Sequence, residues 1–177
     1  MAKFFRRFIG VLVLDASVYE EIEADARADT QSVAIVIAAT AAGGFAAMGL
    51  GLVGVSGFIA AAITVLGGWL VWVSLIAALG TTRMAEPQTH SSARELLRTM
   101  GYAAAPGVFL GFAAMRSVAP LMLALVSVWM IAAAVMAARQ ALDFRSVTRA
   151  VAVCGVSWAL SIGVLVLIAT VMARPVE

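Results

Sequence analysis

The sequence predicts an all-α fold: a polytopic membrane helical bundle of five transmembrane helices, preceded by N-terminal amphipathic helices. Hydrophobic residues make up 63% of the chain, charged residues only 12%, and the mean hydropathy is +1.03. A soluble domain carries about 25% charged residues, so a soluble core of this size could not cover so much apolar surface. The few charges between residues 31 and 173 divide that region into five apolar lengths. We therefore expect a cytoplasmic segment at 1–30, a bundle at 31–173 and a short external tail at 174–177.

The N-terminal segment begins with a short amphipathic helix over residues 4–14. Eleven residues are too few to cross about 30 Å of hydrocarbon, and the cations Lys3, Arg6 and Arg7 flank an apolar side. This composition favours a helix in the headgroup plane, with its cations on anionic lipid. A second, acidic helix should follow, capped by Asp15 or Ser17 and reaching about residue 28.

Four of the predicted spans are long and strongly apolar: about 31–54, 57–79, 118–138 and 147–173. A turn centred on Ser56 makes the first two antiparallel neighbours. Ser92 and Glu95 form a capping box that opens a further helix. That helix becomes apolar over about 100–115, the third span, which is short and contains Pro106. The proline should kink it, and a re-entrant segment is the alternative.

The distribution of cations predicts the orientation. With five spans, ten cations share one side and two, Arg116 and Arg174, lie on the other. The positive-inside rule then puts the N-terminus in the cytoplasm and the C-terminus outside, as expected for a bacterial inner-membrane protein. A re-entrant third segment would make the split nine to three, so five spans fit better.

The chemistry-bearing residues argue against an enzyme. No ionisable residue is predicted near a span centre, where proton relays are found, and a single histidine without clustered cysteines or carboxylates makes no metal site. We expect no catalytic residue, no metal and no cofactor. The net charge of +2 is too small to indicate nucleic acid.

Charged residues gather on the predicted cytoplasmic side and are the first candidates for contacts with membrane lipids, a protein partner or a second copy of the chain. Pairing of these opposite charges with each other is the alternative for most of them. The candidates are Lys3, Arg6, Arg7, Glu20, Glu21, Arg94, Arg98, Arg139, Arg145 and Arg149.

A second candidate site lies between the third and fourth spans. Prolines interrupt both, and Arg116 lies between them at the outer boundary, where it would otherwise serve as an interface anchor. Interrupted helices often border binding sites, so a transporter, channel or lipid-handling protein is the alternative function. A cavity reaching Trp129 would support it. The candidate residues are Arg116, Trp129, Pro106 and Tyr102.

Two further patterns concern packing. Small residues recur at every fourth position, for example Ala103, Gly107 and Gly111 in the third span and Gly155, Ala159 and Gly163 in the fifth, which favours close helix contact. The four tryptophans fall near span centres instead of at the interfaces. Their indole N–H groups therefore need acceptors inside the bundle, for which Ser74, Thr64, Ser127 and Ser161 are candidates.

Three stretches resemble bacterial members of the Yip family of five-span membrane proteins. They are 14–22, from Leu14 to Ile22; 95–102, ending in Gly101–Tyr102 and followed by Pro106; and 139–143, Arg-Gln-Ala-Leu-Asp. Ala16 stands where bacterial relatives often have proline. The resemblance implies a cytoplasmic N-terminus, five helices and a non-enzymatic, membrane-organising or adaptor role.

Overall fold

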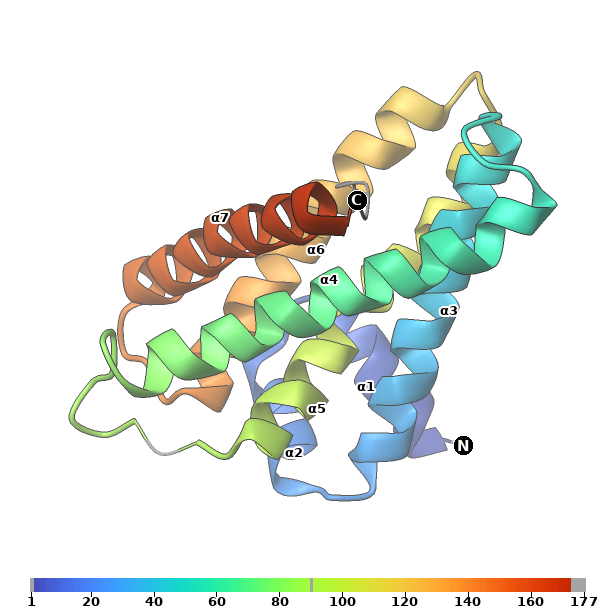
Figure 1. The fold of residues 1–177 in the computed structure, drawn as a ribbon. Coiled ribbons are helices and arrows are strands. Elements are labelled where there is room, and N and C mark those ends of the chain that lie inside the picture. The colour runs from blue at the N-terminus through green and yellow to red at the C-terminus, as the bar shows by residue number, and fades with distance from the viewer. Residues whose placement is uncertain (1, 90, 173–177) are drawn as a thin grey trace.

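The computed structural model describes residues 2–89 and 91–172, which form helices joined by turns and loops, with no strand among them. The elements are, in order, α1 (Ala2–Leu12), α2 (Ala16–Ala24), α3 (Ala28–Gly49), α4 (Val55–Thr81), α5 (Ala93–Ala103), η1 (Ala105–Ala114), α6 (Ala119–Ala141) and α7 (Val147–Met172). Figure 1 shows the long helices α3, α4, α6 and α7 side by side and tilted, with α1, α2 and α5 gathered at one end. The predicted tail at 174–177 lies outside the described residues.

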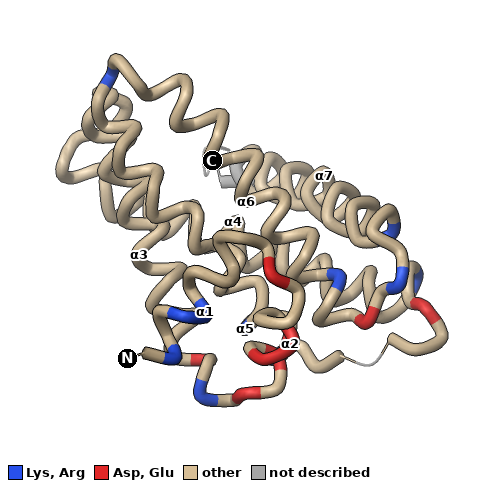
Figure 2. Tube along the Cα trace, turned by 180° about the vertical axis from the view of Figure 1, so that it is seen from behind, with Lys and Arg blue, Asp and Glu red and all other residues tan. Residues whose placement is uncertain are grey.

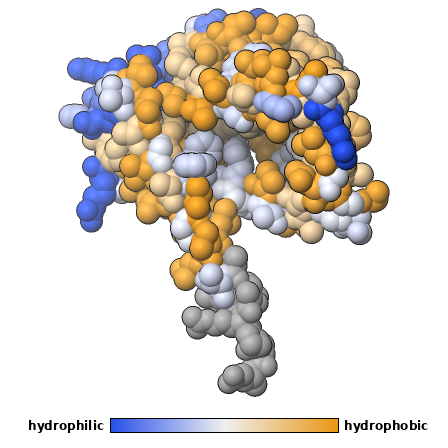
Figure 3. All heavy atoms as spheres, turned by 90° about the horizontal axis from the view of Figure 1, so that it is seen from above, coloured by the Kyte–Doolittle hydropathy of each residue, from blue (hydrophilic) through white to orange (hydrophobic). Residues whose placement is uncertain are grey.

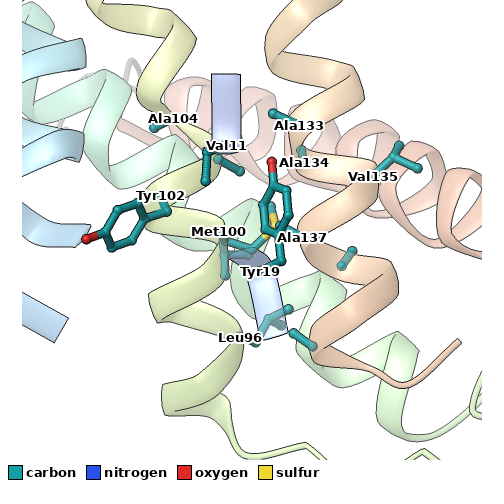
Figure 4. Packing of buried hydrophobic residues seen from close by; sticks show 14 of the residues in the cluster. Val11, Tyr19, Leu96, Met100, Tyr102, Ala104, Ala133, Ala134, Val135 and Ala137 are labelled. Atoms are coloured by element: carbon teal, nitrogen blue, oxygen red, sulfur yellow. The ribbon is translucent and has the colours of Figure 1, made fainter. Parts of the chain in front are cut away.

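The two N-terminal helices pack into the bundle. Asp15 caps α2 through its side chain, which accepts from the backbone N–H of Ser17. Tyr19 and Ile22 of α2 are fully buried, as is Val11 of α1. Figure 4 shows Tyr19 inserted towards α6, with its hydroxyl directed at Ala133 and Ala134. The expected headgroup-plane position of α1 therefore holds for one edge of the helix at most, because the other edge is core.

Among the described residues, four helices are long and apolar enough to cross a membrane: α3, α4, α6 and α7 over residues 147–168. The fourth and fifth predicted spans agree closely with α6 and α7. The first span ends at Gly49, earlier than predicted, because the chain turns at Gly51, whose φ is +77°. Only glycine adopts that conformation readily. The remaining apolar residues of the predicted span lie in the turn before α4.

The third predicted span, about 100–115, is not the single kinked α-helix that we expected. Helix α5 opens with the predicted capping box between Ser92 and Glu95, but it ends at Ala103. Residues 105–114 then form a 3-10 helix, η1, with Pro106 in its first turn. The proline changes the helix type instead of kinking an α-helix. A 3-10 helix rises about 2.0 Å per residue against about 1.5 Å for an α-helix, so these ten residues cover about 20 Å.

Segment α5–η1 runs parallel to α3 along the length of that helix. Gly101 lies against Ser32, Gly107 against Ala39, and Gly49 at the end of α3 against Ala114. A Cβ atom added to any of these glycines would come within 3.0 Å of its neighbour. The small residues predicted in the third span therefore do bring two backbones together. Those of the fifth span do not, since a Cβ atom added to Gly155 or Gly163 would point into open space, with no atom of another element within 4 Å.

Two of the four tryptophans, Trp72 and Trp129, have acceptors other than the predicted hydroxyls. The indole N–H of Trp72 donates to the carbonyl oxygen of Cys154 at 3.0 Å, which joins α4 to α7. That of Trp129 donates to the carbonyl oxygen of Leu12 at 2.8 Å, which joins α6 to the end of α1. Thr64, Ser74 and Ser161 each bond to a carbonyl of their own helix instead. The Leu12 carbonyl lies at the end of α1 and the Cys154 carbonyl lies within α7, and the sequence pattern indicated neither as an acceptor.

Candidate functional site

Charge divides the molecule into two ends. Figure 2 shows the blue and red residues gathered towards the end that holds α1, α2, α5 and the α6–α7 turn, which we call the charged end. At the opposite end, among the described residues, the one charged side chain is Arg116, in the turn between η1 and α6. Figure 3 shows that most of the surface seen from above is hydrophobic, with hydrophilic groups gathered mainly at the left edge and a separate one on the right. Polar chemistry is therefore available almost only at the charged end.

The centre of the charged end is a fully buried arginine. The side chain of Arg7 is 0% exposed; its Nε lies 2.9 Å from Glu21 Oε1 and its Nη2 lies 2.7 Å from Asp25 Oδ2. Its third nitrogen donates to Gln31 Oε1 at 3.3 Å, and Tyr102 donates to the same oxygen. This Arg7 cluster joins α1, α2, α3 and α5. Arg7, a candidate lipid contact in the sequence, faces protein instead.

The carboxylates of the Arg7 cluster are held in the ionised form. The hydrogen bonds from Lys3 and Arg7 lower the pKa of Asp25 far below its ordinary value. Burial raises the pKa of Glu21, but the hydrogen bond and charge of Arg7 outweigh burial and leave it lowered. The same bonds overcome burial at Arg7, whose pKa is raised. Exposed Arg6 also pairs with Glu21. The basic and acidic N-terminal helices thus pair with each other.

A second buried arginine fixes α5. Arg98 donates to Asp29 Oδ1 at 2.5 Å and to the backbone carbonyl of Glu23. The Glu23 carboxyl differs from the carboxylates of the Arg7 cluster in its pKa. Burial and the nearby charges of Asp143 and Glu95 raise that pKa to about 7. The charge of Arg98 opposes that rise but is too weak to cancel it. Glu23 therefore changes its charge near neutral pH.

Of the remaining candidate residues at the charged end, some bond to other parts of the chain and others are exposed. Glu20 accepts from the side-chain amide of Gln140 at 3.0 Å, and Arg139 donates to the carbonyl of Phe144 at 3.3 Å. Arg94 is exposed and makes no ion pair within the described part of the chain. Arg145 contributes its backbone N–H to Glu86 at 3.0 Å, so its side chain is not used in that bond.

A basic hollow of about 470 Å³ lies between the α4–α5 loop and the start of α7. Its lining includes Arg83, Arg149, Ser146 and Thr148. Arg149 is held in place by Glu86 at 3.3 Å and by the carbonyls of Met84 and Ala85. Arg83 is exposed and forms no ion pair with any described residue. The sequence had singled out Arg149 but not Arg83, whose loop position gave no signal beyond its charge.

An apolar groove of about 720 Å³ runs between η1 and α6. Three aromatic rings lie in it in series: Phe112 stacks on Phe109 with centroids 6.5 Å apart, and Phe109 stacks on Trp129 at 5.7 Å. The i, i+3 spacing of the phenylalanines is aligned by the 3-10 geometry, in which such residues eclipse. Aliphatic residues of α6, from Leu121 to Ala132, form the opposite wall.

The groove unites only part of the predicted intramembrane site. Trp129 lines it, and Arg116 lies in the turn that joins its two walls. Pro106 and Tyr102 do not line it; both are buried, and Tyr102 belongs to the Arg7 cluster. The sequence analysis missed Phe109 and Phe112. Their spacing of three is a signal only if the segment is known to be a 3-10 helix.

Comparison with known proteins gave one family. A family model described as the Yip1 domain matches residues 9–168, which is most of the chain. The match begins within α1 and reaches the last turns of α7, so it includes the groove and the charged end except for the first residues of α1, Arg7 among them. Comparisons with curated proteins and with solved structures gave no match.

Proposed function

This chain belongs to the Yip1 domain family, and on that premise we propose that it is a non-enzymatic integral membrane protein that organises membrane or binds a partner through its charged end. Its apolar helices support the membrane location. The basic hollow carries the proposal for the charged end, because Arg83, which forms no ion pair with any described residue, lines it together with Arg149. The ligand is a protein partner, a second copy of the chain or an anionic lipid headgroup.

The topology that goes with this proposal has five crossings, with the charged end in the cytoplasm of a bacterial cell. Its support is the parallel course of α5–η1 along α3, from Ser32 to Gly49, together with the positive-inside rule. The test is labelling of intact cells with a membrane-impermeant maleimide in a Cys154→Ser background. Ser117→Cys should be labelled and Ala26→Cys should not. The reverse pattern, or equal labelling of both, overturns this topology.

Purification from native membranes in a mild detergent tests the binding role. We expect a stoichiometric partner or a homo-oligomer that is lost in an Arg83→Glu, Arg145→Glu double variant, because charge reversal beside the hollow repels an anionic surface. Arg27→Glu is the matched control: it reverses one exposed charge of the same end, in the turn between α2 and α3. A monomer without a partner contradicts the proposal, and equal loss in the control assigns the effect to overall charge.

A second function, lipid handling, is favoured by a separate observation. The groove between η1 and α6 is apolar, open and reaches Trp129, as the alternative interpretation of the sequence required. Small-molecule sites in helical bundles are commonly apolar clefts between helices. Under this function the groove holds part of a lipid, and the charged end plays a supporting role by fixing α1 against the bundle.

A further inference from the structure

The groove has a direction, set by its two ends. Its far end is the turn between η1 and α6, where Phe112 and Leu121 lie on opposite walls. Its inner end is at Trp129 and Ala132. From Leu121 to Ala132 an α-helix rises about 17 Å. The groove is therefore elongated along α6 and open to the outside, and it is not a spherical cavity.

One cation lies beside the far end of the groove, in the turn after η1, although it is not among the residues that line the groove. Arg116 is exposed in the turn that connects the two walls, and no other described residue of that end is charged. Its recorded polar contact is a bond from Nε to the carbonyl oxygen of Gly49 at 3.4 Å, longer than ordinary N–H···O bonds of about 2.7–3.2 Å. The guanidinium carries five N–H donors, so most of them are available to an anion.

We propose that the groove seats an acyl chain of an anionic phospholipid whose phosphate pairs with Arg116. The proposal rests on the lipid-handling function above and adds to it the class of lipid. Charge complementarity at one end selects the headgroup, since guanidinium groups bind phosphate oxygens in a bidentate fashion. The apolar groove, with its stacked aromatic rings, binds the acyl chain without discriminating between chains of different lipids.

Trp129 provides the means to observe the bound chain. Its ring stacks at the inner end of the aromatic series, and its N–H is fixed on the carbonyl of Leu12. A chain in the groove lies against this ring. Trp69, Trp72 and Trp158 do not line the groove, so replacing those three with phenylalanine leaves a single reporter at the site.

The experiment measures quenching of this single tryptophan in nanodiscs by lipids with brominated acyl chains. Brominated phosphatidylglycerol and brominated phosphatidylcholine are compared at equal mole fraction in an unbrominated background. One cation near a headgroup changes relative affinity by about fivefold, so we expect phosphatidylglycerol to quench Trp129 at about a fifth of the mole fraction that phosphatidylcholine needs. Arg116→Gln should abolish that preference, and Arg116→Lys should keep most of it. Higher salt should weaken it.

Each outcome separates the two claims. Ala124→Phe, which fills the groove from the α6 wall, should reduce quenching by both lipids. If both lipids quench Trp129 no more strongly in the protein with Ala124 than in the Ala124→Phe variant, the groove holds no lipid. Lipid handling then fails as well. If both lipids quench equally, or the preference survives Arg116→Gln, only the headgroup inference is overturned. Exposed Arg116 can be replaced without disturbing the core, which thermal unfolding in the same nanodiscs checks.

Discussion

Substitution of Arg7 tests whether the Arg7 cluster holds the N-terminal helices on the bundle. Arg7→Met keeps a similar apolar length but removes bonds to Glu21 at 2.9 Å, Asp25 at 2.7 Å and Gln31 at 3.3 Å. Loss of one member of a buried ion pair costs about 3–5 kcal/mol. The two carboxylates here are 26% and 21% exposed and keep Lys3 or Arg6 as partners, so we expect a loss of about 2–4 kcal/mol.

The matched control is the neighbouring residue. Arg6 pairs with the same Glu21, but its side chain is 62% exposed. Exposed pairs contribute below about 1 kcal/mol, so Arg6→Met should change the free energy of unfolding little. Arg7→Lys should recover only part of the loss, because a lysine cannot reproduce the guanidinium fork.

Cys154 supplies the assay. It is the one cysteine of the chain and is buried, so a maleimide dye reports the fraction unfolded during an SDS titration in mixed micelles. The reasoning is refuted if Arg7→Met and Arg6→Met have equal effects, or if Arg7→Met stabilises the protein. Protection of α1 from trypsin distinguishes local release of the helix from global unfolding.

Three further predictions concern other parts of the fold. The pKa of Glu23 is raised from 4.5 to about 7 in the folded protein, so the contribution of its protonated carboxyl to the free energy of unfolding is fully present below pH 4.5 and is lost as the pH rises through 7. In the dye assay, Glu23→Gln should therefore make the free energy of unfolding depend less on pH between 4.5 and 7. Gly49→Ala should destabilise the protein by about 1–3 kcal/mol because its Cβ would lie 2.7 Å from the Ala114 backbone, whereas Gly155→Ala, with open space around it, should be neutral or stabilising. Trp129→Phe keeps the stacked ring but removes the 2.8 Å bond to the end of α1, and should cost about 1 kcal/mol and make α1 more susceptible to trypsin.

The spans that the sequence predicts well are those in which apolar length and helix length coincide. The fourth and fifth are of this kind, since Pro120 marks the start of α6 and polar residues precede α7. The end of the first could not be found from hydropathy, because apolar residues continue past Gly49 although the helix does not. Backbone conformation at Gly51 decides that boundary, and a transfer scale does not register it.

Pairing of charges between the two N-terminal helices could be predicted from their opposite signs. Burial of Arg7 could not, because it depends on Gln31 and Tyr102, which α3 and α5 bring to the cluster from distant positions. The family resemblance likewise identified the stretches around Tyr19 and Tyr102 without showing their roles. In the structure both tyrosines are fully buried, one against α6 and the other in the Arg7 cluster.

The 3-10 conformation of η1 connects the groove to the rest of the molecule. As an α-helix, residues 105–114 would be about 5 Å shorter and residues three apart would be about 60° out of line. Phe109 and Phe112 would then no longer share one edge, and the aromatic series that ends at Trp129 would be broken. The poorer hydrogen bonds of a 3-10 helix are offset where η1 meets α3, at Gly107 against Ala39 and at Ala114 against Gly49. Small residues on the α3 side therefore permit the geometry that aligns the aromatic residues on the α6 side. Since Trp129 also holds the end of α1, a lipid that fills the groove would contact a residue on which the docking of the N-terminal helices depends.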